Sequence, residues 1–134
     1  MEHAPHRPTL ALDVLPDVLC VARLAPDASL PVSVLRSRGL VSLTRTVEEL
    51  SVVCREQDAP AQARVERGWR ALRVAGPLDV ALTGVLASLA QPLADAGISV
   101  FAVSTFDTDY LLVREVALDR AVQALQAAGH RVTR

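Results

Sequence analysis

The sequence has 134 residues, 51% of them hydrophobic, which is enough to bury a core in one compact domain or in two small ones that share a core. Its formal net charge of -1, from 14 basic and 15 acidic residues, offers no broad positive surface for a nucleic acid backbone. No run approaches the roughly 18 apolar residues that a membrane-spanning helix requires, and the first ten residues lack a signal-peptide core. We therefore expect a soluble cytoplasmic protein that binds neither nucleic acid nor membrane.

The two cysteines, Cys20 and Cys54, lie 34 residues apart in separate apolar runs. They form no CxxC motif and no Cys/His cluster, so the sequence predicts neither a metal site nor a cofactor. In a reducing cytosol both are expected to be small buried hydrophobic residues. His3 and His6 belong to a proline-rich leader and are expected to be solvated.

The first half of the chain is predicted to be rich in strands. Pro16-Asp17 separates two short apolar runs, which favours a tight hairpin or a bulge between them. Gly39 is expected to end a short helix, and residues 56–68 are the one candidate linker. The predicted elements are strands over 9–15, 18–24, 40–46 and 50–55, with one or two helical turns over 32–38.

The second half alternates strand and helix patterns. Asp79 is a candidate cap for a helix that ends at Gly97, and Pro92 inside this helix predicts a kink or a break. The run 98–105 is apolar on both alternating faces, which predicts a central strand covered on each side. The predicted elements are strands over 69–75, 98–105, 110–114 and 130–134, with helices from Asp79 to Gly97 and from about Val116 to Gly129.

Each predicted helix carries one apolar face at i, i+3, i+4 spacing. The order strand, helix, strand, strand, helix, strand is that of the ferredoxin-like α+β fold, in which four antiparallel strands carry both helices on one face. The residues expected on the two faces are Val85, Leu86, Leu89, Leu93 and Ala96 in the first helix, and Leu118, Ala121, Val122, Leu125 and Ala128 in the second.

A hairpin pattern occurs twice. LVSLTRTVEELSVVCRE, over 40–56, aligns without a gap with SVFAVSTFDTDYLLVRE, over 99–115, and this pairs Thr46 with Thr105. The helix region of the first half is shorter, and no second helix fits before Pro60. We therefore predict two tandem modules, a truncated one over 1–60 and a complete one over 61–134. A truncated half leaves apolar strand faces uncovered, which predicts a homodimer.

The segment GPLDVALTGVLASLAQPLADAGISVFAVSTFDTDYLLVRE, over 76–115, resembles the ACT domain family. It is most similar to the ACT-like branch found in CASTOR-type cytosolic arginine sensors and in small bacterial proteins. The matching motifs are the strand that ends in Gly76-Pro77, the GVLASL helix core, the AGISVF junction and STFDTDYLLVRE. The resemblance implies a ferredoxin-like fold and a regulatory module, without catalytic activity, that binds a free amino acid at an interface between ACT units.

The resemblance also implies which residues would bind the ligand. One unit would contribute the loop before its first helix and the turn after its second strand, and its neighbour would contribute the start of the second strand. Backbone N–H groups at the helix start could hold the ligand carboxylate, and a carboxylate in the turn could hold its ammonium group. The residues at these positions are Asp79, Leu82 and Gly84 in the loop, Thr105, Phe106 and Asp109 in the turn, and Ser99 and Val100 from the neighbour.

The sequence departs from the arginine sensors at two of these positions. Leu82 aligns with their acidic residue that meets the guanidinium group, and Asp79 aligns with a glycine. An aliphatic side chain leaves a buried guanidinium unpaired, at a cost of several kcal/mol. A small or apolar amino acid is therefore the expected ligand, and an alternative is a structural dimerisation or scaffold module that binds none.

Catalytic alternatives fit the sequence poorly. Asp107 and Asp109 follow an apolar strand like the DxD loop of haloacid-dehalogenase phosphatases, but Leu111 replaces the expected Thr or Val and the chain has no lysine. Two turn aspartates that close a hairpin are an equally simple interpretation. Outside the leader, His130 is the one histidine available as a general base. We therefore predict that the protein is not an enzyme.

Overall fold

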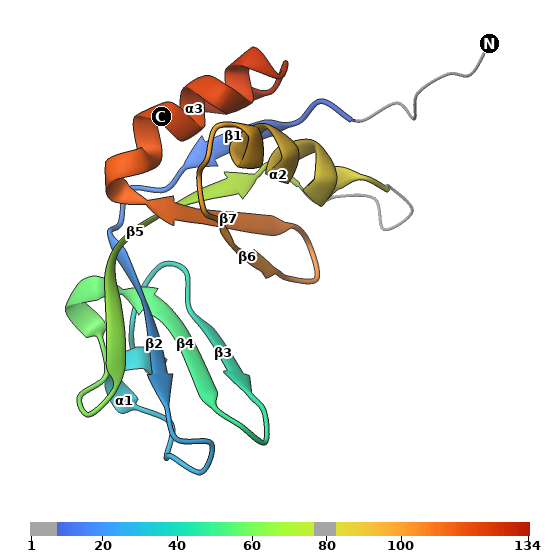
Figure 1. The fold of residues 1–134 in the computed structure, drawn as a ribbon. Helices are drawn as coiled ribbons and strands as arrows, with labels where there is room; N and C mark the ends of the chain where they lie inside the picture. The colour runs from blue at the N-terminus through green and yellow to red at the C-terminus, as the bar shows by residue number, and fades with distance from the viewer. Residues whose placement is uncertain (1–7, 77–82) are drawn as a thin grey trace. The chain divides into compact units, whose positions relative to one another are not determined.

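The computed structural model describes residues 8–76 and 83–134, which form two compact units (Figure 1). The split unit combines the segment up to Leu15 with Ala71–Arg134, and the inserted unit is Pro16–Arg70. The long strand β5 (Arg64–Val74) therefore contributes residues to both units. The division into modules 1–60 and 61–134 stays a prediction.

The split unit has the predicted ferredoxin-like order, β5–α2–β6–β7–α3–β8, with one additional strand from the N-terminal segment. Its strands lie in the order β6-β7-β5-β1-β8, and helices α2 and α3 share one core beside the sheet (Figure 1). Its elements besides β5 are β1 (Ala11–Val14), α2 (Val85–Asp95), β6 (Phe101–Ser104), β7 (Asp109–Arg114), the 3-10 turn η2 (Glu115–Ala117), α3 (Leu118–Ala127) and β8 (Arg131–Thr133).

Alternate residues of the strands meet the helices in a single hydrophobic core. Leu89, Leu93 and Leu125 have no exposed surface, as the helical periodicity predicts. Of the residues expected on the two apolar faces, Leu86, Ala96 and Ala128 are instead exposed. The core comprises Leu12, Leu72, Val74, Val85, Leu89, Leu93, Ile98, Leu111, Val113, Ala117, Leu118, Ala121, Val122 and Leu125.

Of the two alternatives predicted at Pro16-Asp17, the tight hairpin between residues 9–15 and 18–24 is wrong. The two strands instead follow each other along β5 with extra residues between them, which agrees with the bulge. Strand β1 pairs antiparallel with the end of β5 and parallel with β8, whereas β2 (Leu19–Leu24) pairs with β4 (Leu50–Arg55) and with the start of β5. The reason lies in β5, because its 11 residues give each short strand a separate antiparallel partner. The last strand, β8, consequently borders β1 instead of completing a four-stranded sheet beside β5.

The expectation of a central strand over 98–105 is also wrong. Strand β6 covers only Phe101–Ser104, pairs with β7 alone among the described strands, and forms an edge of the sheet. Its alternate residues Ala102 and Ser104 are exposed. A nearly continuous apolar run is typical of a buried strand; here Ile98 instead packs into the core just before the strand begins.

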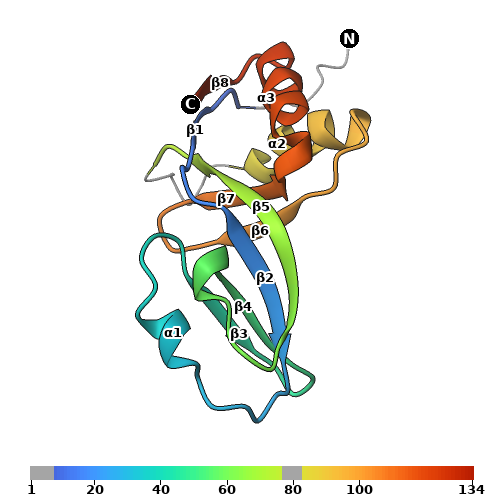
Figure 2. The same ribbon diagram turned by 90° about the vertical axis from the view of Figure 1, so that its left-hand side faces the viewer.

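The inserted unit is a small sheet with its own core (Figure 2). The predicted linker over 56–68 is partly wrong, because β5 begins within it at Arg64. Its strands lie in the order β3-β4-β2-β5, and Val34 of the one-turn helix packs into its core. Its further elements are α1 (Val32–Leu35), β3 (Ser42–Arg45) and the 3-10 turn η1 (Glu56–Asp58).

The two repeated hairpins have matching geometry. Strands β6 and β7 and the turn η2 begin and end 59 residues after β3, β4 and η1 respectively. In each hairpin the threonine N–H at the turn donates to the carbonyl three residues on, at 2.9 Å from Thr46 to Glu49 and at 2.8 Å from Thr105 to Thr108. The hydrophobic residue after each threonine is solvated, with Val47 92% and Phe106 96% exposed.

Candidate functional site

The turn between β6 and β7 is held rigidly by threonines. The Thr105 hydroxyl lies 3.1 Å from the Thr108 carbonyl oxygen, to which it donates, and 3.3 Å from the Thr108 backbone nitrogen. Thr108 itself is buried, and its hydroxyl donates to the carbonyl of Val74, the last residue of β5, at 2.7 Å. The turn is thereby attached to the point where the chain leaves β5 toward α2.

Asp109 begins β7, directly opposite Ser104. The Ser104 hydroxyl donates to the Asp109 carboxylate at 2.6 Å, a short distance that is typical of a charge-assisted hydrogen bond. Asp109 is half-buried, whereas Asp107 and Phe106 at the tip are exposed. Of the two aspartates, Asp109 is therefore the one with an oriented carboxylate.

The remaining predicted site residues lie on two segments. Gly84 precedes α2 and has a left-handed conformation, with φ of 75°, which glycine adopts without strain. Ser99 is exposed and Val100 is half-buried against the core, just before β6. Asp79 and Leu82 lie outside the described residues.

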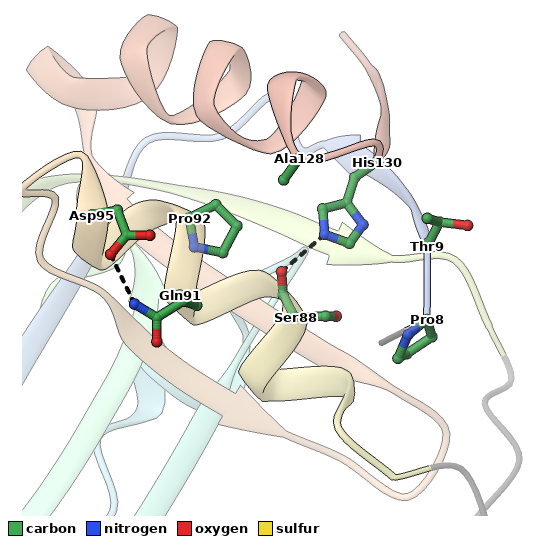
Figure 3. A pocket seen from close by; sticks show the side chains of 8 residues that line it. All are labelled: Pro8, Thr9, Ser88, Gln91, Pro92, Asp95, Ala128 and His130. Carbon is green, nitrogen blue, oxygen red and sulfur yellow. Dashed lines mark hydrogen bonds between the residues drawn. The ribbon is translucent and has the colours of Figure 1, made fainter. Parts of the chain in front are cut away.

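A cavity of about 250 Å³, which was not predicted from the sequence, lies in the split unit beside His130 (Figure 3). His130 is 5% exposed. Its Nδ1 accepts a hydrogen bond from the Leu10 N–H at 3.1 Å, so the ring proton is on Nε2, which donates to the Ser88 carbonyl at 2.9 Å. The lining residues are Pro8, Thr9, Ser88, Gln91, Pro92, Asp95, Ala128 and His130.

The His130 bond explains how α2 accommodates a proline. A helix carbonyl normally accepts from the N–H four residues later, and for Ser88 that residue is Pro92, which has none. The Nε2–H of His130 supplies the missing donor. Helix α2 therefore runs through Pro92 without the predicted break, and no nitrogen of the His130 ring is left for catalysis. No pattern in the sequence links Pro92 to His130, so this contact was not predicted.

In the part of the chain that the structure describes, no three His, Cys, Asp or Glu side chains gather around a point where a metal ion could bind. None of the helices in residues 8–76 and 83–134 combines the length and apolar character needed to cross a membrane.

The fold and the β6–β7 turn define a class of protein. It consists of small ferredoxin-like domains in which a polar turn is attached to the end of the strand that precedes the first helix. Residues 64–127 match the ACT domain family, and residues 17–62 match a second family that describes an N-terminal domain. This segment, residues 64–127, belongs to the ACT domain family.

Two solved structures have a similar fold. The crystal structure of an Agobacterium tumefaciens protein is 38% identical, with a TM-score of 0.87 over 93% of this chain and 92% of that one. The regulatory subunit of aspartate kinase from Thermus thermophilus is 11% identical, with a TM-score of 0.65 over 88% and 96% of the two chains, and shares the fold.

A human relative, the cytosolic arginine sensor for mTORC1 subunit 1, is 41% identical over 59 residues. The match covers 43% of this chain and 18% of the length of that relative. The similarity is therefore confined to a small part of the sensor.

Replacing Thr108 by valine tests the attachment of the turn to β5. Thr108→Val keeps the shape of the side chain but leaves the Val74 carbonyl without its donor, so we expect a loss of about 1–3 kcal/mol in the free energy of unfolding. Urea denaturation measures it. The exposed Thr44→Val on β3 is the control and should change stability by less than about 0.5 kcal/mol. Equal losses in both variants would show that the Thr108 bond contributes nothing.

A double-mutant cycle tests the role of His130. His130→Phe keeps an aromatic ring but removes both hydrogen bonds, and should cost about 1–3 kcal/mol for each buried group left unpaired. In a Pro92→Ala background, residue 92 has an N–H that can donate to Ser88. The cost of His130→Phe should then fall by at least about 0.5 kcal/mol in urea denaturation. Strict additivity would contradict this account.

Proposed function

We propose that the protein is a regulatory module, without catalytic activity, that binds a free amino acid at an interface between ACT units. The observation that carries the proposal is the Asp109 carboxylate, oriented by Ser104 in a turn that Thr108 attaches to the end of β5. A fixed carboxylate can bind the ligand ammonium group, and the backbone N–H groups at the start of α2, after Gly84, could bind its carboxylate.

The proposed ligand is a small or apolar amino acid. At the position where the arginine sensors have an acidic residue, this chain has Leu82, which offers no partner for a guanidinium group. Ser99 and Val100 of a neighbouring ACT unit complete the proposed site. The proposed location is the cytoplasm, because the similar arginine sensor is a cytosolic protein.

The neighbouring unit is proposed to come from a second copy of the chain that pairs along β6. Hydrogen-bonded and non-hydrogen-bonded residue pairs alternate along an antiparallel hairpin, and Thr105 with Thr108 is a hydrogen-bonded pair. Ala102 and Ser104 are therefore in non-hydrogen-bonded pairs, and their backbone N–H and C=O groups point away from β7. The run from Gly97 to Phe106 has no charged residue that would block pairing at this edge. The matching hairpin geometry supports the proposed tandem modules, the first of them truncated.

Thermal denaturation against the twenty amino acids tests ligand binding. A ligand that binds only the folded protein adds about 2.7 kcal/mol at 100 times its dissociation constant, and so raises the Tm. We expect the rise to disappear in Asp109→Ala and to persist in Asp107→Ala, the matched control on the same turn. A rise that survives Asp109→Ala would place the site elsewhere. No rise with any amino acid would favour the structural scaffold, for which the exposed Phe106 is a suitable contact.

Sedimentation velocity over a dilution series tests the dimer. Ala102→Pro removes an N–H that points away from β7, so it should yield a monomer while leaving the β6–β7 pairing intact. Ala102→Val keeps that N–H and should sediment as the dimer. A wild-type chain that sediments as a monomer at all concentrations would exclude this interface.

A further inference from the structure

The two cysteines face each other inside the inserted unit. Cys20 on β2 lies directly opposite Cys54 on β4, and the sulfur atoms are 3.7 Å apart. Neither side chain has exposed surface, and both belong to the core that also contains Val34 and Val52. The sequence predicted their burial correctly but gave no sign that two residues 34 positions apart meet.

The register allows a covalent bond between them. The Glu56 N–H donates to the Val18 carbonyl at 2.9 Å, which makes these opposed residues a hydrogen-bonded pair. Such pairs alternate along an antiparallel ladder, so Cys20 and Cys54 form the next hydrogen-bonded pair, with an expected Cα–Cα distance of about 5.5 Å. Disulfides span Cα–Cα distances of about 4.4–6.8 Å, so little backbone movement is needed.

We propose that Cys20 and Cys54 are a reversible oxidation site, which a small hydroperoxide converts into an intramolecular disulfide. This site is separate from the proposed amino-acid site, which lies in the split unit.

The chemistry of the pair favours Cys20 as the first nucleophile. The Cys54 thiol can donate a hydrogen bond to the Cys20 thiolate, which lowers the pKa of Cys20, and the positive charge of Arg67 acts in the same direction against the effect of burial. The pKa of Cys54 is raised because the same hydrogen bond and burial favour its protonated form. The attacking species is the thiolate, so Cys20 reacts first.

The reaction is balanced with hydrogen peroxide as the oxidant. The Cys20 sulfur attacks one peroxide oxygen, the O–O bond breaks, and hydroxide leaves and becomes water, which gives a sulfenic acid. The Cys54 sulfur then attacks the Cys20 sulfur, loses its proton, and expels the hydroxyl group as a second water. Two thiols are thereby oxidised by two electrons, and one peroxide is reduced to two waters.

Alkylation after peroxide treatment tests the proposal on the full chain. The reduced protein is exposed to hydrogen peroxide, freed of peroxide, unfolded in guanidinium chloride with N-ethylmaleimide, and weighed as an intact chain. We expect both alkylation sites to be lost together, with no oxygen added beyond the one on the single methionine, and to be restored by dithiothreitol. Non-reducing electrophoresis should show a single-chain species. Cys20→Ala and Cys54→Ala are the matched controls, in which no intramolecular crosslink can form.

Two results would overturn the proposal. One is a wild-type protein that keeps both alkylation sites after peroxide treatment. Oxidation of its single methionine in the same sample would show that the peroxide was active. The other is loss of alkylation with oxygen added to each sulfur, or with crosslinks between chains only. Both outcomes are read on the wild-type chain, so they do not depend on the folding of the alanine variants.

Discussion

Strand β5 is the constraint on which the rest of this structure depends. Its first residues pair with β2 and its last residues pair with β1, while β7 also pairs with it. One run of 11 residues therefore supplies a strand to each compact unit. The last residue of β5 positions the candidate site, because the Val74 carbonyl accepts the hydrogen bond that attaches the β6–β7 turn. A disturbance in β5 would reach the turn through that hydrogen bond and through the pairing of β5 with β7.

The two repeated hairpins have the same backbone but different surroundings. At the position of the oriented Asp109 the first hairpin has Leu50, which is buried in the core of the inserted unit. The polar pair Ser104–Asp109 likewise corresponds to Arg45–Leu50, where the arginine side chain donates to the carbonyls of Pro26 and Ala28. The geometry of the turn is thus common to both, whereas the chemistry needed to hold an ammonium group is present in one.

Local patterns in the sequence were sufficient for most elements and insufficient for their pairing. Gly97 and Gly129 mark the helix ends because left-handed backbone favours glycine, and both have positive φ. The pairing of β1 could not be predicted, because short apolar runs do not specify which distant strand they join. The edge position of β6 was missed for the same reason. Asp109 was identified through the family resemblance, while its Ser104 partner follows from the cross-strand register.

The contacts of His130 and of the paired cysteines depend on residues far apart in sequence. Leu10 and His130 are separated by 120 positions, and a one-dimensional pattern contains no information about such a contact. Burial of each residue type was the most that composition could suggest. Their hydrogen-bond partners required the three-dimensional arrangement.

The interruption of the split unit by the inserted unit has a consequence for the order of folding. Strand β1 precedes the inserted unit in the sequence, yet one of its two partners, β8, follows α3, with Ala11 opposite Arg131. Closing so long a loop is entropically costly, and contacts of this kind slow folding. The inserted unit has a continuous chain and can assemble before β8 has been synthesised. The split unit cannot be completed until then, so the edge of β1 that will pair with β8 stays unpaired in this interval and is vulnerable to mispairing.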